Sequence, residues 1–241
     1  MAASKHTPYF ESLEALQAGD CPVCVTSKRS VDRYLDTLLY EAANDPGVRA
    51  RTRAAHGFCR LHAWQMRRHG GSLEMAIIYR DVVRDAAAAL EGATYVRGTR
   101  LSPRALAEAV DRDRPNNATA PLVEALSPQG ECPACRIQLK AEAMNVDVLL
   151  EHLADEKIAA AMDQGGSLCL PHLRLALQRV RGREAHDLLL ERARRSYSAL
   201  LADLDEMIRL SDYRFRDQQL GDVGDTWITA IARVAGEDGL A

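Results

Sequence analysis

The stretch Cys21-Pro-Val-Cys24 is followed by Cys59-Arg-Leu-His62, and the same pattern returns as Cys132-Pro-Ala-Cys135 and Cys169-Leu-Pro-His172. The offset from Cys21 to Cys132 is larger by a single position than the offset from Cys59 to Cys169. All 6 cysteines of the chain belong to this pattern. The chain therefore contains an internal duplication with a one-residue slip between its copies.

Each copy supplies three thiols and one imidazole, which is the number and type of ligands that close a tetrahedral structural zinc site. A proline after the first cysteine favours the start of a helix, where the helix dipole and unpaired backbone N–H groups stabilise thiolates. We therefore predict one metal site in each copy. The predicted ligands are Cys21, Cys24, Cys59 and His62 in the first copy, and Cys132, Cys135, Cys169 and His172 in the second.

The residue types favour zinc, two ions per chain, over other metal centres. A closed site of four protein ligands leaves no position for water or substrate, so it indicates a structural role. The alternative is an iron–sulfur protein for electron transfer or redox sensing, although the closely spaced cysteine runs usual for clusters are missing. A third interpretation is a thiol sensor whose cysteine pairs form disulfides and release zinc on oxidation.

Composition favours an all-α fold. The chain has 241 residues, 47% of them hydrophobic and only 5% aromatic, and no segment alternates as a strand would. We predict two related helical units, each stapled by a Cys3His metal site, and a C-terminal helix that closes the structure. That closing helix is expected to be capped by Asp225 and to bury Trp227, Ile228 and Ile231.

The predicted organisation has four parts. They are an N-terminal helical metal-binding unit (1–95), a Pro-rich linker with short helices (96–131), a second helical metal-binding unit (132–211) and a C-terminal docking segment (212–241). The linker holds four of the 9 prolines, and Ser102-Pro103 in it could start a short helix. In the second unit, Pro171 is expected to delay the start of the ligand-bearing helix by one residue.

Net charge and sequence motifs reduce the classes of function to consider, but they do not assign one. With 31 basic and 34 acidic residues, the chain has a net charge of −3, which requires neither nucleic acid nor a membrane surface as a partner. No apolar run approaches a membrane span and no signal peptide begins the chain, so we expect a cytoplasmic protein. No catalytic or organic-cofactor motif appears. We therefore expect a non-enzymatic scaffold that binds another protein.

The motifs also resemble a known group of sequences. The residues concerned include Cys21-Pro-x-Cys24, the stretch Gly57-Phe-Cys-x-x-His-Ala-Trp64 and the tail Asp212-Tyr-Arg-Phe215. They resemble a family of uncharacterised bacterial proteins known only as a domain of unknown function and expected to be helical. The second copy lacks the Gly-Phe and Ala-Trp that flank the first Cys-x-x-His. The resemblance implies no activity, substrate or partner.

Overall fold

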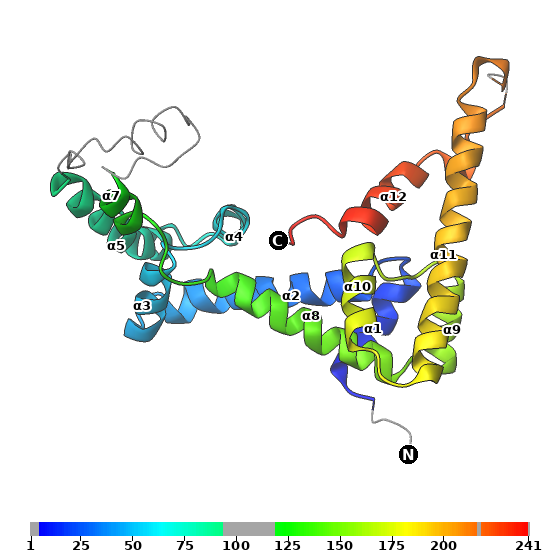
Figure 1. Ribbon diagram of the computed structural model, residues 1–241, viewed down its shortest axis with the longest axis horizontal. Helices are drawn as coiled ribbons and strands as arrows, with labels where there is room; N and C mark the ends of the chain where they lie inside the picture. Colours follow the sequence, from blue (N-terminus) through cyan, green and yellow to red (C-terminus); the bar gives the residue numbers. More distant parts are fainter. Residues whose placement is uncertain (1–4, 94–118, 216–217, 241) are drawn as a thin grey trace, which may run out of the picture. The chain divides into compact units, whose positions relative to one another are not determined.

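A computed structural model describes residues 5–93, 119–215 and 218–240 of the chain (Figure 1). Every regular element in these ranges is a helix, which confirms the predicted all-α class. The part of the predicted linker up to residue 118, with the short helix expected at Ser102, lies outside the described residues.

Internal contacts divide the chain into two compact units. Unit 1 comprises Met1–Leu35 and Ala134–Ala241, and unit 2 comprises Asp36–Pro133. The divisions fall inside two helices, α2 (Pro22–Thr37) and α8 (Pro133–Glu151). The four-part organisation by sequence order, at residues 95, 131 and 211, stays a prediction.

Unit 1 is built around a core shared by both copies of the duplication. Besides parts of α2 and α8, its elements are α1 (Thr7–Gln17), α9 (Glu156–Asp163), α10 (Leu170–Arg179), α11 (Arg183–Leu210), the 3-10 turns η3 (Tyr213–Phe215) and η4 (Gly221–Val223), and α12 (Thr226–Ala235). The core joins apolar side chains from α1, α8, α9 and α11, such as Leu16, Leu149, Ile158 and Leu189. Both Cys24 and Cys169 belong to it, so the thiols lie inside a packed apolar environment.

Helix α9 begins at a well-defined polar cap. The carboxylate of Asp155 accepts hydrogen bonds from the backbone N–H groups of Lys157 (3.0 Å) and Ile158 (3.4 Å). The Tyr9 hydroxyl of α1 also donates to Asp155 (2.8 Å), and Lys5 forms an ion pair with it (2.8 Å). These bonds satisfy orphan donors at the helix start and attach α1 to α9.

The chain passes very close to α1 just before it reaches Cys169. A Cβ atom added to Gly166 would lie 2.3 Å from the carbonyl oxygen of Leu16. Only glycine can be accommodated at such a distance from backbone atoms. Gly166 therefore allows the segment that carries Cys169 to lie directly against the end of α1.

Unit 2 contains the remaining helices of the described residues. They are the π-helix η1 (Leu38–Ala42), α3 (Pro46–Ala54), α4 (Arg60–Met66), the 3-10 turn η2 (Arg67–His69), α5 (Ser72–Glu91) and α7 (Ala120–Ala125). Ion pairs from Arg49 to Asp81 and from Arg53 to Asp85 join α3 to α5. Gly57 has a left-handed φ of +87°, and its backbone lies against the Tyr79 ring, which sets the turn that leads into Cys59.

The π-helix explains the one-residue slip between the copies. Asp45 and Asp155 cap equivalent helices, α3 and α9. The distance in sequence from Asp45 to Asp155 equals the distance from Cys59 to Cys169. The segment from Cys24 to Asp45 is longer by a single residue than the corresponding segment from Cys135 to Asp155. A π-turn accommodates one inserted residue without ending the helix. The extra residue of the first copy is therefore absorbed at Leu38–Ala42.

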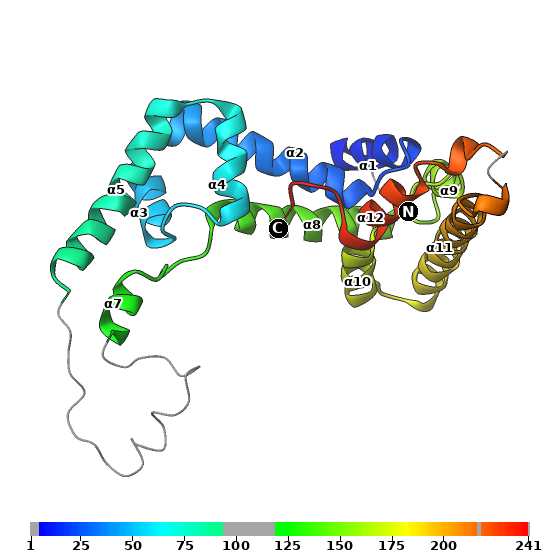
Figure 2. The same cartoon turned by 90° about the horizontal axis from the view of Figure 1, so that it is seen from above.

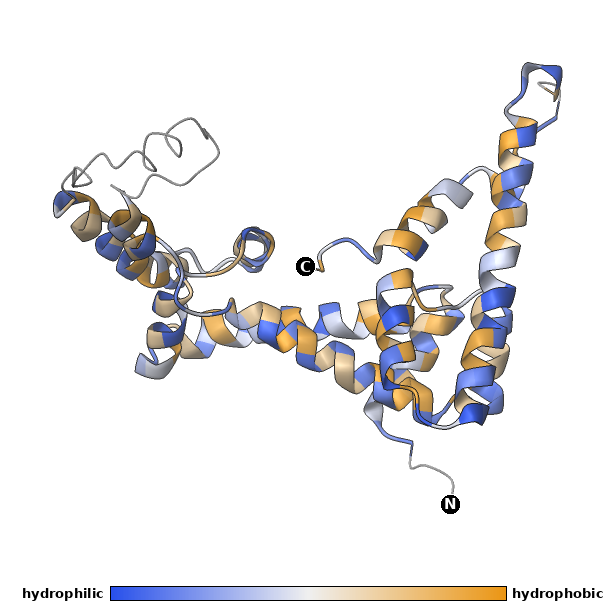
Figure 3. Cartoon of the chain, in the orientation of Figure 1, coloured by the Kyte–Doolittle hydropathy of each residue, from blue (hydrophilic) through white to orange (hydrophobic). Residues whose placement is uncertain are grey.

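The orientation of α12 differs from the prediction. The helix contacts α10 and α11, as a closing helix should, but Trp227, Ile228 and Ile231 are 50%, 50% and 56% exposed. Arg233 is buried instead, and its guanidinium donates to the carbonyl of Gly165 (3.0 Å). Asp225 is the N-cap residue, but its side chain makes no capping hydrogen bond. Figure 3 shows that α12 contains several hydrophobic residues, and periodicity identified them as one face of the helix but not whether the rest of the chain covers that face.

Candidate metal sites

The eight predicted ligands gather into two groups, and each group draws on both copies of the duplication. The first site contains Cys21, Cys24, Cys169 and His172, and the second site contains Cys59, His62, Cys132 and Cys135. Within each group, the possible ligand atoms all lie within 4.8 Å of one another. The eight residues are thus brought together as two sets of three thiols and one imidazole.

The predicted pairing within each copy is wrong. Each site takes its Cys-x-x-Cys pair from one copy and its Cys-x-x-His pair from the other. The reason is that α2 and α8, the helices that follow the two Cys-x-x-Cys pairs, run in opposite directions in both views (Figures 1 and 2). The start of each long helix therefore lies at the end where the other one finishes, and the chain after α8 supplies Cys169 and His172.

Helix starts position the ligands, as the sequence predicts. Cys59 and Cys169 are the N-cap residues of α4 and α10, with extended backbone that turns each thiol back toward its helix. Helix α10 begins at Leu170 with Pro171 in its first turn, so the expected one-residue delay does not occur. Proline is tolerated there because the first N–H groups of a helix have no intrahelical acceptor.

The distances in the first site match a single tetrahedral ion. His172 Nδ1 lies 3.5 Å from Cys21 Sγ, 3.3 Å from Cys24 Sγ and 3.2 Å from Cys169 Sγ, and the last two sulfurs are 3.6 Å apart. Around one zinc ion, with Zn–S of about 2.3 Å and Zn–N of about 2.0 Å, tetrahedral ligands stand roughly 3.5 to 3.8 Å apart. These donors therefore fit one ion with little rearrangement.

Charge in the first site is shared among closely packed groups. Hydrogen bonds with Cys21, Cys24 and His172 hold the pKa of the Cys169 thiol far below its ordinary value, whereas hydrogen bonds with Cys169 and Cys21 raise that of Cys24. Burial opposes a charge on His172, but its bonds to Cys169 and Cys21 prevail and raise the pKa to about 11. The site therefore favours a thiolate at Cys169 beside a cationic His172, and a divalent cation could neutralise such a thiolate.

Unit 1 also covers the first site with its C-terminal segment. The backbone N–H of Glu237 donates to Cys24 Sγ (3.5 Å), and a Cβ atom on Gly236 would lie 3.6 Å from the same sulfur. Lys28 holds this segment by donating to the Asp238 carbonyl (2.8 Å). All four ligands of the first site are buried.

The second site is less enclosed. His62 Nδ1 lies 3.2 Å from Cys59 Sγ and 3.7 Å from Cys132 Sγ, distances that also suit one ion. His62 is buried, but Cys59, Cys132 and Cys135 are half-buried. The two sites therefore share a ligand set and differ in their access to solvent.

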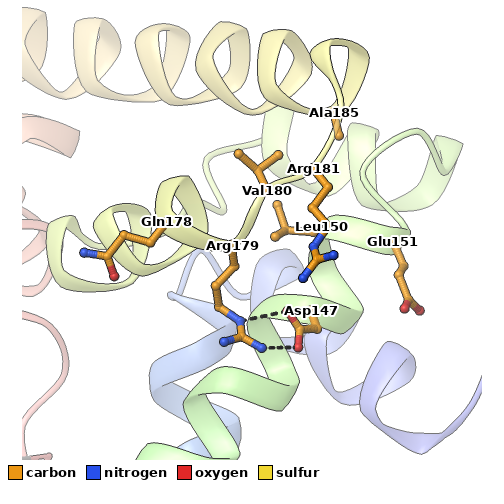
Figure 4. A pocket seen from close by; sticks show the side chains of 8 residues that line it. All are labelled: Asp147, Leu150, Glu151, Gln178, Arg179, Val180, Arg181 and Ala185. Carbon is orange, nitrogen blue, oxygen red and sulfur yellow. Dashed lines mark hydrogen bonds and ion pairs between the residues drawn. The ribbon is translucent and has the colours of Figure 1, made fainter.

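A groove of about 560 Å³ lies away from the metal sites, near the turn between α10 and α11 (Figure 4). Arg179 of α10 makes a two-fold hydrogen bond with Asp147 of α8 beside it, with 2.8 Å between Nε and Oδ1. The groove is lined by Asp147, Leu150, Glu151, Gln178, Arg179, Val180, Arg181 and Ala185. The Arg179 guanidinium lowers the pKa of Asp147, which suits an ion pair that joins two helices.

Comparisons with known proteins point to an uncharacterised family. Residues 10–110 match a family described as a family of unknown function (DUF6062). A stretch of 72 residues is 38% identical to the "Uncharacterized 23.9 kDa protein in xynA 3'region" of Caldicellulosiruptor sp. (strain Rt8B.4). The match covers 30% of this chain and 35% of that protein, about a third of the relative's length. No solved structure matches. These likenesses confirm the resemblance to an uncharacterised family.

Among the helices in the described part of the chain, none is both long enough and apolar enough to cross a bilayer.

Proposed function

We propose that this protein is a non-enzymatic helical scaffold held together by two structural zinc ions, one in each site. The observation that carries the proposal is the gathering of all 6 cysteines and two histidines into two compact Cys3His groups. Each zinc ion would link helices that are distant in the sequence. A structural zinc site contributes an apparent free energy of about 10 kcal/mol or more in small domains, enough to decide whether the local fold forms.

The compactness of the groups supports zinc over an iron–sulfur cluster. In a cluster, the protein ligands bind different iron atoms, so they stand farther apart than four ligands of one ion. Ligand atoms within 4.8 Å of one another suit a mononuclear centre better. The four donors also fill a tetrahedral coordination sphere, which leaves no open position for substrate and supports a structural role.

The state of the cysteines supports a reducing location. All six belong to the two Cys3His groups, and zinc–thiolate sites are favoured where disulfides are kept reduced. We therefore assign the protein to the cytoplasm as part of the proposal.

The partner that we propose for the scaffold is another protein. The exposed apolar face of α12 supports this partner, because four of its apolar side chains are each at least half exposed: Trp227, Ile228, Ile231 and Val234. Contiguous exposed apolar side chains rimmed by polar ones are typical of protein–protein interfaces.

Metal analysis of protein purified without oxygen tests the proposal. We expect two zinc ions per chain by elemental analysis, a colourless solution and loss of helical structure after removal of the metal by a strong chelator. A brown protein with iron, labile sulfide and absorption near about 400 nm would replace zinc by iron–sulfur clusters. Full helicity without any bound metal would contradict the structural role.

A further inference from the structure

The two nitrogens of His172 face different partners. Nδ1 lies 3.2 to 3.5 Å from the three sulfurs of the first site. On the other side of the ring, Nε2 lies 3.6 Å from the Oε1 atom of Glu142 in α8. Both side chains are enclosed, with 6% of His172 and 12% of Glu142 exposed. The imidazole is therefore placed between the metal ligands and a largely buried carboxylate.

A second side chain holds that carboxylate in place. The Nε2 atom of Gln138, one turn earlier on α8, donates a 2.7 Å hydrogen bond to Oε1 of Glu142. Gln138 is itself only 2% exposed. Side chains four residues apart lie on the same face of a helix, so this bond limits the rotation of Glu142. The carboxylate is consequently fixed beside the imidazole before any metal binds.

We propose that Glu142 is a positioning residue of the first site, which keeps the proton of His172 on Nε2 and directs Nδ1 to the metal. A carboxylate behind a metal-ligating histidine fixes the tautomer and the ring orientation and makes the ligating nitrogen more basic. Loss of such a partner commonly lowers metal affinity by about 10- to 100-fold. The inference rests on the proposed zinc function and assigns a role to residues outside the ligand set.

The duplication supplies an internal contrast. Counted from the first cysteine of each Cys-x-x-Cys pair, Val31 in α2 holds the position that Glu142 holds in α8. Val31 is fully buried and carries no polar atom in its side chain. The equivalent position in α2 therefore offers no carboxylate, and removal of Glu142 should leave the second site unchanged.

The test is a chelator challenge on the full zinc-loaded chain, read separately for each cysteine. Glu142→Gln keeps the shape but removes the charge, and Glu142→Leu removes the acceptor as well. The matched control is Glu151→Gln, which removes an exposed carboxylate from the same helix. A thiol alkylating agent is added together with a zinc chelator, and peptide mass spectrometry then gives the modification rate of every cysteine.

We expect Cys21, Cys24 and Cys169 to lose protection at about 10- to 100-fold lower chelator concentration in Glu142→Leu, with Glu142→Gln in between. Cys59, Cys132 and Cys135 should behave as in the unmodified protein, and Glu151→Gln should leave both sites unchanged. Glutamine has nearly the same shape as the native glutamate. Better protection of the first site in Glu142→Gln than in Glu142→Leu would show that the polar atoms at this position, rather than its packing, hold the metal site together.

Failure of the inference is distinguishable from failure of the zinc proposal. If the unmodified chain binds two zinc ions and both Glu142 variants protect the first site normally, the role of Glu142 is overturned while the zinc sites stand. An equal loss at both sites would indicate general destabilisation and would also overturn it. If Glu142→Leu does not fold, Glu142→Gln and Gln138→Leu decide, because normal protection in both contradicts the inference. If the unmodified chain binds no zinc, the proposed function fails first.

Discussion

The Sγ atoms of Cys24 and Cys169 lie 3.6 Å apart, although 145 residues separate them in the sequence. This contact means that neither copy of the duplication completes a metal site alone. Because each candidate site takes one pair from each copy, the two halves would depend on each other for metal binding. Metal loss at the first site should therefore affect helices from both copies at once.

The two sites should differ in their chemical reactivity. The first site is buried and receives an N–H donor from Glu237, whereas the three cysteines of the second site are half-buried. We expect Cys59, Cys132 and Cys135 to react first with an alkylating agent or with peroxide, since accessible thiolates react fastest. Mass spectrometry of partially modified protein checks this order, and equal rates in both sites would contradict it.

Gly166 should be intolerant of substitution. Gly166→Ala would force a Cβ atom to 2.3 Å from the Leu16 carbonyl, so backbone atoms would have to move. We expect a loss of about 3 kcal/mol in the free energy of unfolding, the upper end for overpacking. The control is Gly165→Ala, where φ is +116° but nothing lies within 4 Å, and a cost of about 1 kcal/mol is expected from backbone strain alone. Urea denaturation gives both values, and equal losses would show that the contact is not limiting.

The equivalent helix caps should differ in strength. Asp45 accepts one backbone hydrogen bond, from Val48 (2.7 Å), so Asp45→Ala should cost about 1 kcal/mol. Asp155→Ala also removes the partner of the Tyr9 hydroxyl, which should raise the cost to about 2 to 3 kcal/mol. Chemical denaturation monitored by circular dichroism measures the two variants, and a larger loss in Asp45→Ala would refute this ranking.

Asp155 should also produce a specific pH dependence. The hydrogen bond from Lys5 and that from Tyr9 hold the pKa of this carboxyl well below its usual range, against the effect of burial. Because the folded pKa is depressed, the stabilisation is complete above the unfolded value of about 3.9 and is lost as the pH falls below it.

The comparison with Asp155→Asn isolates this contribution from the acid lability of the metal sites. The difference in unfolding free energy between the two proteins should be constant from about pH 7 to pH 5 and should shrink below about pH 4. Denaturation curves at a series of pH values provide the measurement. A difference that stays constant in acid would mean that Asp155 carries no depressed pKa.

The sequence contained enough information for the helices and the ligands. The Cys-Pro-x-Cys and Cys-x-x-His spacings identify residues that helix starts bring together, and the structure places all eight in two groups that could hold a metal ion. Long segments with helical periodicity, such as Arg183–Leu210, form helices. These features depend on local spacing, which the sequence contains directly.

The partners of the ligands and the face of α12 depend on tertiary packing instead. The Cys-x-x-Cys and Cys-x-x-His pairs have the same internal spacing in both copies, so the spacing does not show which pairs combine, and the opposite directions of α2 and α8 decide. Likewise, the spacing of Trp227 and Ile231 shows an apolar face but cannot show whether this chain covers it. The inward position of Arg233 depends on the carbonyl of Gly165, which is 68 residues away.

The most direct test of the exchanged pairing is the zinc content of two double variants. If Cys24 and Cys169 share one ion, Cys24→Ser with Cys169→Ser should retain one zinc ion per chain, whereas Cys24→Ser with Cys59→Ser should retain none. Elemental analysis of the purified proteins distinguishes the outcomes. The reverse result, with no zinc in the first double variant and one ion in the second, would contradict the exchange of ligands between the copies.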